Sequence, residues 1–468
     1  MPHESTICAI STPPGNGAIA VIRLSGPEAI QIADQVFIAS GNRKQLIGQP
    51  ANTIHHGFLK DGKEEVDEVL VSLFRAPHSY SGEDLVEVSC HGSEYIQQKV
   101  LELFIRKGAR LAKPGEFTMR AFLNGKMDLS QAEAVADLIV SDSEATHRVA
   151  LKQMKGGFSS EIARLREKLL NFISLLELEL DFSEEEVEFA NRKQLQELLQ
   201  EIESNIGKLA GSFKDGNVMK NGIPTAIAGK TNVGKSTLLN AILKDDRAIV
   251  SEIEGTTRDV IEDVVFIEGL KFRFIDTAGL RKSSDTIEKL GIEKALAKID
   301  QAYIVLYLLD ATKKPEELDR LIGKIKQRLT GKDQKLLLLF NKTDLLAPEK
   351  IKKLKDINIY QNLSQNDHCL YISAREQNTG DLLKQLAKLA KPDLGKNDVV
   401  VTNVRHYEAL TKAGEAVNRA LKGLDTALPT DLLAMDIREV LYHLGEITGE
   451  VSNDQILGNI FKNFCVGK

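Results

Sequence analysis

The chain has little cysteine, no long apolar run and no strong excess of charge of either sign. Its four cysteines, Cys8, Cys90, Cys369 and Cys465, are widely scattered, which fits neither a zinc site nor a disulfide framework. No run of about 20 apolar residues is present to indicate a membrane span, and the first residues lack the basic and then apolar pattern of a secretion signal. We therefore expect a cytoplasmic protein in a reducing compartment.

The length and the charge limit the architecture and the partners. With 468 residues the chain is too long for one hydrophobic core, so two or three domains are expected. Its 42% apolar and 27% charged residues are ordinary for a globular protein. The formal net charge of −6 excludes a global basic field that recruits nucleic acid, but it does not exclude local basic patches.

A phosphate-binding loop is predicted where the chain reads Gly-Lys-Thr-Asn-Val-Gly-Lys-Ser. An apolar run at 223–228 predicts a strand before the loop, and Lys235–Leu243 predicts a helix after it. Backbone N–H groups of the loop would bind phosphate oxygens, Lys235 would neutralise the outer phosphates, and the Ser236 hydroxyl would ligate Mg²⁺. The nucleotide contacts predicted in this loop are Asn232, Val233, Gly234, Lys235, Ser236 and Thr237.

Two later segments predict Mg²⁺ coordination and guanine recognition. The first, which follows an apolar strand at 272–275, consists of Asp276, Thr277, Ala278 and Gly279. An Asp at a strand end can hold Mg²⁺ through water, and the Gly279 amide can reach the γ-phosphate. The second, which follows the run 336–340, contains Asn341, Lys342 and Asp344. Asp344 can accept two hydrogen bonds from the N1–H and N2–H₂ edge of guanine, which adenine lacks, so ATP would be rejected.

The rest of the guanine pocket is predicted from the same loops. Asn341 would tie its loop to the phosphate loop, and the stem of Lys342 would cover the base. After a third apolar run at 370–372, the backbone of Ser373, Ala374 and Arg375 would contact guanine O6. Because these segments follow the phosphate loop in the order that a GTPase needs, we predict that the chain binds GTP.

The hydrolytic residues depart from the common pattern. Leu280 stands where many small GTPases have a glutamine that orients water, so another group must do this or the intrinsic rate is low. Thr257 is the candidate switch hydroxyl for Mg²⁺. Asn232, with backbone carbonyls of the switch loop, could hold a monovalent cation that supplies the charge of an arginine finger. The alternative for Asn232 is a turn former with positive φ.

Periodicity divides the remainder of the chain. Residues 1–125 have strand-length apolar runs at Ile7–Ile10, 19–24, 69–74 and 85–88, and a helical pattern at 94–107, which predicts an α+β domain. Helical spacing then dominates to 219, with one apolar stripe made of Ile162, Leu165, Leu169, Phe172, Ile173, Leu176 and Leu180. A second stripe follows a linker at 392–397 and contains Leu433, Ile437, Val440, Leu441, Leu444 and Ile447. The acidic residues Glu184, Glu185, Glu186 and Glu188 are interpreted as a solvated helix face.

We predict a multidomain protein in which an α/β GTPase domain with a doubly wound, mostly parallel sheet is inserted into a helical domain. The later helical stripe has nowhere obvious to bury itself except against the earlier helices. The alternative is two separate helical modules. The predicted domains are 1–125 (α+β), 126–219 (helical, first part), 220–391 (GTPase) and 392–468 (helical, second part).

Over its whole length the chain resembles the MnmE (TrmE) family of tRNA modification GTPases. The motifs that carry the resemblance are Thr-Pro-Pro-Gly at 12–15, Arg-Leu-Ser-Gly at 23–26, Ser-Gly-Glu-Asp at 81–84, Pro-Gly-Glu-Phe at 114–117, Arg-Ala-Phe-Leu-Asn at 120–124, Gly-Thr-Thr-Arg-Asp at 255–259 and Phe-Cys-Val-Gly-Lys at 464–468. The chain departs from the family pattern at Val466, usually Ile, at Lys230 and Thr231, often Arg-Pro, and at Asn16, usually Arg. The last departure weakens any expectation of an electropositive N-terminal loop.

The resemblance implies an activity and partners. Family members act with a flavin-dependent partner, MnmG, in a heterotetramer or larger complex, to install an aminomethyl-type group on C5 of the wobble uridine of certain tRNAs. A reduced folate (5-formyl- or methylene-tetrahydrofolate) supplies the one-carbon unit. The N-terminal domain binds folate and forms the homodimer, and the G domains approach one another in a potassium-dependent way.

The resemblance also implies site residues. The folate contacts carry over as Arg23, Glu87, Lys126 and Lys468, because basic groups can pair the folate carboxylates and a carboxylate can accept from the pterin; the alternative is that each is a surface charge. The K⁺ ligands carry over as Asn232 with the carbonyls of Ser251, Ile253 and Thr256, and the Mg²⁺ ligands as Ser236 and Thr257.

Two catalytic residues are implied by the resemblance. Glu288 aligns with the glutamate that replaces the missing glutamine and would act through a bridging water; without the family it reads as an exposed glutamate at a helix start. Cys465 is expected to matter for modification, as a nucleophile toward uridine C6 or as a one-carbon carrier, if its pKa is depressed. The alternative for Cys465 is an unreactive buried thiol.

The alternative function is a regulatory or ribosome-assembly GTPase switch without modification chemistry. The G domain fits this function equally well, and only the folate residues and the Cys-Val-Gly-Lys tail distinguish the two. A membrane-associated GTPase is disfavoured because the chain lacks a membrane span and a basic amphipathic helix.

Overall fold

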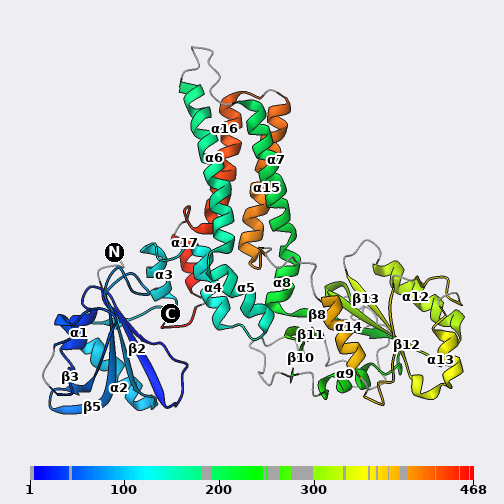
Figure 1. The fold of residues 1–468 in the computed structure, drawn as a ribbon, viewed down its shortest axis with the longest axis horizontal. Coiled ribbons are helices and arrows are strands. Elements are labelled where there is room, and N and C mark those ends of the chain that lie inside the picture. The colour runs from blue at the N-terminus through cyan, green and yellow to red at the C-terminus, as the bar shows by residue number, and fades with distance from the viewer. Residues whose placement is uncertain are drawn as a thin grey trace. The chain divides into compact units, whose positions relative to one another are not determined.

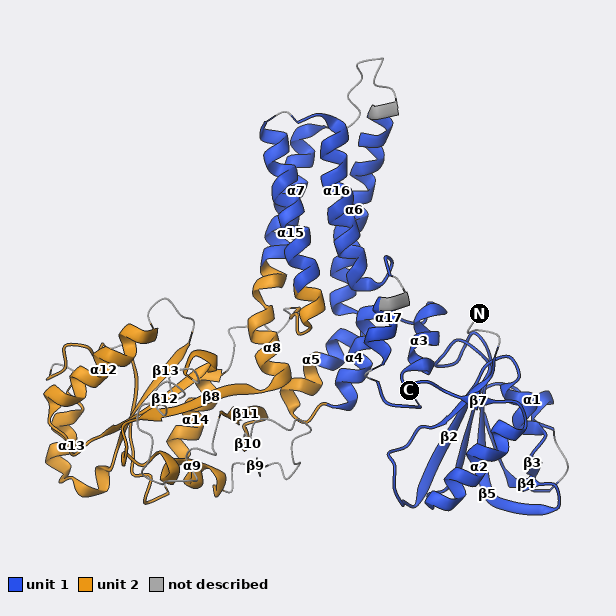
Figure 2. Ribbon diagram, turned by 180° about the vertical axis from the view of Figure 1, so that it is seen from behind, with its two compact units in different colours: residues 1–140, 150–207, 408–468 blue, residues 141–149, 208–407 orange. Residues whose placement is uncertain are grey.

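The computed structural model describes residues 5–41, 45–181, 191–245, 249–250, 263–275, 299–329, 334–356, 359–364, 367–377, 379–390, 399–426, 428–452, 454–462 and 464–467. The chain forms two compact units, coloured separately in Figure 2. Unit 1 contains residues 1–140, 150–207 and 408–468, and unit 2 contains residues 141–149 and 208–407. None of the helices within the described residues has the length and apolar character that a bilayer crossing requires.

Unit 1 begins with a seven-stranded sheet in the order β3-β4-β5-β6-β2-β1-β7. The strands are β1 (Ile7–Ile10), β2 (Ile19–Ser25), β3 (Phe37–Ala39), β4 (Thr53–Asp61), β5 (Glu64–Phe74), β6 (Leu85–His91) and β7 (Arg110–Leu111). All pairs are antiparallel except β1 with β7. Alternating side chains of these strands are buried with α1 (Ala29–Asp34) and α2 (Glu94–Arg106) in one core.

The opposite side of this sheet, called the open face below, carries the side chains that do not enter that core. Strand register places Ala9, Arg23, Glu87, Ser72 and Ile54 in one row across it. Residues paired across antiparallel strands point to the same side of a sheet. The open face therefore brings together a basic and an acidic residue that are 64 positions apart in the sequence.

The rest of unit 1 is helical. Its elements are α3 (Glu116–Leu123), α4 (Leu129–Ile139), α6 (Gly157–Asp181), α16 (Thr430–Thr448), α17 (Asp454–Phe461), most of α7 (Arg192–Gly211) and α15 (Val404–Asp425), and the C-terminal part of α5 (Glu144–Met154). Figure 1 shows α6, α7, α15 and α16 running side by side. The two predicted stripes face this bundle: Ile162, Leu165, Leu169, Ile437 and Ile447 are all fully buried.

Helices that precede and follow residues 208–407 pack directly on one another. The buried guanidinium of Arg166 on α6 donates through Nη1 to the Leu441 carbonyl on α16 and through Nη2 to Glu450 at 2.6 Å. Because these segments share one unit, the helices form one helical domain and not two separate modules.

Unit 2 contains a second seven-stranded sheet in the order β14-β13-β12-β8-β11-β10-β9. Its strands are β8 (Ile223–Gly229), β9 (Ile249–Val250), β10 (Asp263–Ile267), β11 (Leu270–Phe274), β12 (Ile304–Asp310), β13 (Lys335–Asn341) and β14 (His368–Tyr371). Pairing is parallel from β14 to β11 and antiparallel from β11 to β9. Strand β8, which leads into the phosphate loop, lies in the middle of the sheet.

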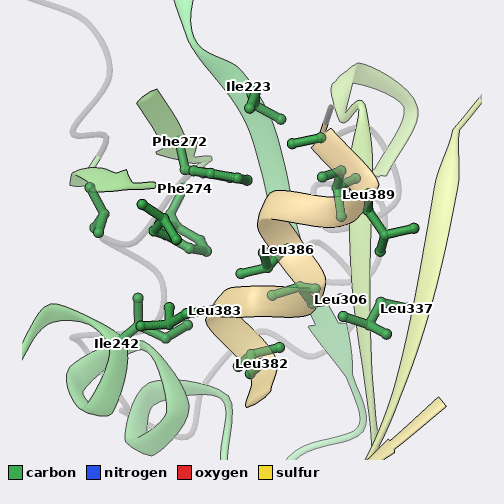
Figure 3. Close-up of a cluster of buried hydrophobic side chains, with 14 of the residues drawn as sticks. Ile223, Ile242, Phe272, Phe274, Leu306, Leu337, Leu382, Leu383, Leu386 and Leu389 are labelled. Carbon is green, nitrogen blue, oxygen red and sulfur yellow. The ribbon is translucent and has the colours of Figure 1, made fainter. Parts of the chain in front are cut away.

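Both faces of this second sheet are covered by helices. One core contains side chains of α9 (Lys235–Leu243) and α14 (Gly380–Ala390), and Figure 3 shows Leu382, Leu383 and Leu386 of α14 pointing to Ile242 and the sheet. The other core contains side chains of α12 (Pro315–Leu329) and α13 (Pro348–Leu354). A further helix of unit 2, α8 (Phe213–Asn221), precedes β8. This is a doubly wound α/β sheet, so the predicted fold class is confirmed.

The observed helices and strands are of the types that the sequence patterns predict, but several of them begin or end at other residues. Strand β1 and helix α9 have the predicted bounds, whereas β5 begins at Glu64 and not at 69. Strand β4 was not predicted. The predicted linker at 392–397 and the acidic residues 184–188 lie outside the described residues.

Candidate functional site

The phosphate loop connects β8 to α9 through backbone conformations that its sequence permits. Gly229 has φ +147 and Gly234 has φ +101, and Asn232 has φ +57, the left-handed region that Asn tolerates. A Cβ on Gly234 would lie 2.4 Å from Asn341 Nδ2, and one on Gly229 would lie 2.6 Å from the Leu308 carbonyl oxygen. Glycine is therefore required at both positions. The positive φ of Asn232 agrees with its interpretation as a turn former and leaves its exposed side chain available as a ligand.

Lys235 lies at the first position of α9 and folds back over the loop. Its Nζ donates to the carbonyl oxygens of Gly229 at 2.9 Å and Lys230 at 2.8 Å. Burial lowers the pKa of this ammonium group. The group is therefore held at the centre of the loop, where it would meet the outer phosphates of a nucleotide. Ser236 and Thr237 follow on the exposed first turn of α9.

Asn341 connects the phosphate loop to two other loops. Its side chain is buried, and its Nδ2 donates to the Val233 carbonyl at 2.8 Å. Its Oδ1 accepts from the Ala374 backbone N–H at 2.9 Å. One amide thus joins the phosphate loop to the Ser-Ala-Arg loop, and the predicted tie between Asn341 and the phosphate loop is present. The Ala374 N–H, predicted to contact guanine O6, already has this partner.

The remaining described residues of the guanine pocket lie beside Asn341. Asp344 is exposed, and its Oδ1 accepts from the Ser373 hydroxyl at 2.8 Å, which fixes the carboxylate. Lys342 has φ +69, and its Nζ pairs with Asp310 Oδ2 at 2.7 Å at the end of β12. Burial works to raise the pKa of Asp310, but hydrogen bonds from Lys342 and Thr312 outweigh it and lower that pKa. The Lys342 stem is thereby held across the end of the sheet.

Several predicted site residues lie outside the described residues. They are Ser251, Ile253, Thr256, Thr257, Asp276, Thr277, Ala278, Gly279, Glu288 and Lys468. Of the predicted Mg²⁺ ligands the described part of the chain contains Ser236, and of the predicted K⁺ ligands it contains Asn232.

A second group of predicted residues meets on the open face of unit 1. Arg23 on β2 and Glu87 on β6 are directly opposite in register, and Nε and Nη2 of Arg23 donate to Glu87 Oε1 at 2.9 and 2.7 Å. The Arg23 side chain is 14% exposed, which contradicts its alternative interpretation as a surface charge. Lys126 is exposed and donates from Nζ to the Pro77 carbonyl at 3.0 Å.

Two aromatic rings that were not predicted flank Arg23. Its guanidinium carbon lies 5.2 Å from the centroid of the Tyr80 ring and 5.6 Å from that of Phe117. Burial raises the pKa of the Tyr80 phenol, which bonds the Thr118 hydroxyl at 2.8 Å. Phe117 belongs to a motif that carried the family resemblance, but no spacing rule in the sequence links either ring to Arg23.

A buried ionic network supports both rings. Arg120 is fully buried and donates to both carboxylate oxygens of Glu83, at 3.0 and 2.9 Å, and to Glu116 at 3.2 Å. Glu116 also accepts from Arg110. Glu83 follows Tyr80 by three residues, and Glu116 precedes Phe117. The network therefore fixes the loop and the helix that place the two rings.

The C-terminal tail, residues 464–467, reaches the same place. The Gly467 carbonyl accepts from Ser11 Oγ at 3.0 Å and from Arg23 Nη1 at 3.4 Å, and the Cys465 carbonyl accepts from the Gly115 N–H at 3.3 Å. Cys465 is exposed, so its alternative interpretation as a buried thiol is wrong. Arg23, Glu87 and the tail are thus neighbours, although 444 positions separate Arg23 from Gly467.

Comparison with known proteins gives matches over the whole chain. A family model described as the MnmE helical domain matches residues 129–465, and one described as the GTP-binding protein TrmE N-terminus matches residues 6–126. A protein of Bacteroides fragilis named tRNA modification GTPase MnmE is 55% identical over 468 residues, which is all of both chains. One of the same name from Flavobacterium johnsoniae is 53% identical over 472 residues, again all of both chains. A solved structure of Era in complex with MgGDPNP and part of 16S ribosomal RNA matches 41% of this chain and 65% of that chain at 26% identity, with a TM-score of 0.25, which is too low to support an argument.

Proposed function

Because this chain belongs to the MnmE family of tRNA modification GTPases, we propose that it hydrolyses GTP within a tRNA-modifying complex. The complex adds an aminomethyl-type group at C5 of wobble uridine with a folate one-carbon unit. GTP turnover reorganises the protein while the chemistry takes place at a separate folate site.

The proposal that the chain binds GTP rests on the position of Asn341. Its buried amide joins the phosphate loop to the loop of Ser373 and Ala374, and Ser373 in turn fixes the Asp344 carboxylate. A carboxylate held in this way selects a base with two adjacent N–H donors, as guanine has. Phosphate binding and base recognition are therefore joined in one rigid unit.

Exchange of Asp344 tests this assignment. Asp344→Asn replaces one acceptor oxygen by an N–H₂ donor, so GTP binding should fall and binding of xanthosine triphosphate, which has a carbonyl at C2, should rise. A loss of about 2–4 kcal/mol for GTP is expected because a donor of the base is left unpaired. The measurement is calorimetric titration with both nucleotides. Unchanged preference for GTP would remove Asp344 from the base site.

The folate part rests on Arg23, Glu87, Lys126 and Lys468 with Cys465 as the exposed thiol. A carboxylate such as Glu87, fixed by Arg23, can accept from a pterin edge, and cationic groups at the rim can pair the carboxylates of the glutamate tail. The charges of Arg23, Glu87 and Lys126, and the hydrogen bonds that these side chains can make, fit a reduced folate. Equilibrium dialysis against 5-formyl-tetrahydrofolate tests it, with Glu87→Gln as the variant that should lose binding.

The hydrolytic part rests on Glu288, on Mg²⁺ held by Ser236 and Thr257, and on K⁺ held by Asn232 with the carbonyls of Ser251, Ile253 and Thr256. Hydrolysis should be much faster in potassium than in sodium at equal ionic strength, and Asn232→Ala should remove the difference. Glu288→Ala should slow hydrolysis without weakening GTP affinity. Equal rates in the two salts would discard the cation site.

The proposed partners are a second copy of the chain, the flavin-dependent MnmG and tRNA. On the open face Ile19, Ile54 and Leu70 are 66%, 68% and 46% exposed, and large exposed apolar side chains on one face of a sheet favour a protein interface. Mass analysis of wobble uridines from cells without this protein tests the whole function. If the uridines keep their modification, the chain is a GTPase switch without modification chemistry.

A further inference from the structure

The tail of residues 464–467 is fixed to unit 1 along its whole described length. Phe464 is buried against Phe461, with ring centroids 5.1 Å apart, in a cluster with Leu129. The next residue is held through the hydrogen bond from Gly115 to the Cys465 carbonyl, and Gly467 is held by Ser11 and Arg23. The Cys465 side chain, between these anchors, remains exposed.

Gly467 is the point of closest approach between the tail and the sheet. It has φ +96, and a Cβ there would lie 2.2 Å from the Ile10 carbonyl oxygen and 3.0 Å from its carbonyl carbon. Real side chains do not approach a backbone oxygen so closely, and positive φ is itself unfavourable for other residues. Any side chain at this position would have to lift the tail from β1.

Arg23 is held so that one side of its guanidinium faces the tail. Nε and Nη2 are directed to Glu87, and the rings of Tyr80 and Phe117 lie within 5.2 and 5.6 Å of the guanidinium carbon. Nη1, on the remaining side, donates to Gly467. The planar guanidinium thus joins Glu87 to the tail in a fixed geometry.

We propose that Arg23 is a positioning residue that clamps the C-terminal tail onto the open face and thereby fixes Cys465 at the folate site. This inference rests on the proposed function for the meaning of Cys465, but the clamp itself does not. Lysine should not replace arginine here, because its donors radiate from one nitrogen, whereas Arg23 reaches Glu87 through Nε and Nη2 and Gly467 through Nη1 on the other side of a planar fork.

The clamp is tested by the mobility of a label on Cys465 in the full-length chain. Burial raises the pKa of Cys8 to about 12 and the pKa values of Cys90 and Cys369 to about 11, so a maleimide nitroxide near neutral pH should react selectively with Cys465. Electron paramagnetic resonance spectra are compared for the unchanged chain, Arg23→Lys, Gly467→Ala and Gly458→Ala. Gly458→Ala is the matched control, because a Cβ there meets nothing within 4 Å.

The unchanged chain and Gly458→Ala should give the broad spectrum of an immobilised label, and Arg23→Lys and Gly467→Ala the narrow spectrum of a mobile one. A mobile label in the unchanged chain, or an immobilised label in both variants, overturns the clamp. Far-UV circular dichroism and the melting temperature of each variant, compared with those of the unchanged chain, check that unit 1 is folded.

A second measurement separates the clamp from the proposed function. Unlabelled Gly467→Ala should lose kcat for uridine modification, whereas its Kd for 5-formyl-tetrahydrofolate should rise much less, because Lys468 is the one proposed folate contact that lies in the tail. If the unchanged chain binds no formyl-folate, the proposed function fails, while the spectra still decide whether the tail is clamped. Normal kcat in Gly467→Ala with a mobile label would refute the positioning of Cys465 as the purpose of the clamp.

Discussion

Arg120 carries a positive charge and is fully buried, so it must be compensated by neighbouring side chains. Its partners Glu83 and Glu116 supply two carboxylates, and Ser5 accepts a further hydrogen bond at 2.9 Å. Removing one partner of a buried ion pair is strongly destabilising, because it leaves the other charge uncompensated, whereas replacing the whole pair by apolar residues costs little. The positions of Tyr80 and Phe117 therefore depend on the charge of these two carboxylates as well as on packing.

Glu116→Gln should destabilise unit 1 by roughly 1–3 kcal/mol at neutral pH, because it removes one of the two carboxylates that compensate the buried charge of Arg120. Burial favours a raised pKa for Glu116, but hydrogen bonds and charges of Arg110, Lys113 and Arg120 lower that pKa overall. A lowered folded-state pKa gives stability that is present above the unfolded value of about 4.3 and is lost as pH falls through the folded value. The difference between the two proteins should therefore shrink below about pH 4.

Urea unfolding followed by far-UV circular dichroism at neutral and acid pH measures this difference. The matched control is Glu102→Gln on α2, whose exposed carboxylate accepts a hydrogen bond from Gln98 Nε2 at 3.2 Å. A surface change of this kind should stay within about 0.5 kcal/mol. A constant difference between Glu116→Gln and the unchanged chain from pH 7 to acid would show that Glu116 does not titrate in this range.

Single residues were predictable where a local motif defines them and not where strand register does. Asn341 was assigned its bridging position from four consecutive residues, and the structure shows that bond. The enclosure of Arg23 by Tyr80, Phe117 and Gly467 depends on contacts between distant segments. No periodicity in the sequence reports such contacts.

Among the elements, α6 and α16 show how one glycine sets the distance between helices. A Cβ on Gly445 would lie 2.6 Å from Arg166 Nη1, which is engaged with the Leu441 carbonyl. Alanine normally stabilises a helix interior by about 1 kcal/mol relative to glycine. Here it would displace a buried guanidinium and cost about 1–3 kcal/mol in lost hydrogen bonds.

Gly445→Ala should therefore lower the melting temperature of unit 1, whereas Gly414→Ala should raise it. Gly414 lies in α15, and its added Cβ would make ordinary contact with Ile206 at 3.5 Å. The same chemical change thus has opposite signs in two helices of one bundle. Calorimetry of both variants decides the point, and a stabilised Gly445→Ala would show that Arg166 moves aside without penalty.

Elements with a strong apolar period were found from the sequence, and those without one were not. The stripe from Leu433 to Ile447 has helical spacing and forms the buried side of α16. Strand β4 pairs with β5 along its whole length. Its own sequence has no clear apolar alternation, because Ile54 is exposed and two histidines follow it. That strand is specified by its neighbour, so its own sequence gives little sign of it.

At the scale of the whole molecule, the chain builds separate cores from interleaved segments. Residues 150–207 and 408–468 belong to one unit although 200 residues of the other lie between them in the sequence. The insertion could be predicted because the second apolar stripe needed a partner. The boundaries at 125, 219 and 391 remain predictions, since composition changes gradually where helices continue from one unit into the other.

Separate cores predict separate responses to ligands. A guanine nucleotide that binds folded unit 2 should stabilise that unit by about 2.7 kcal/mol at 100 times its Kd. Hydrogen exchange of peptides from 208–245 and 334–356 should slow accordingly, and exchange in 150–181 should not change. With 5-formyl-tetrahydrofolate the reverse pattern is expected, with protection in 5–41 and 85–123. Equal protection of both units by either ligand would mean that they unfold as one cooperative system, because a ligand raises the stability of every segment that must open together with its site.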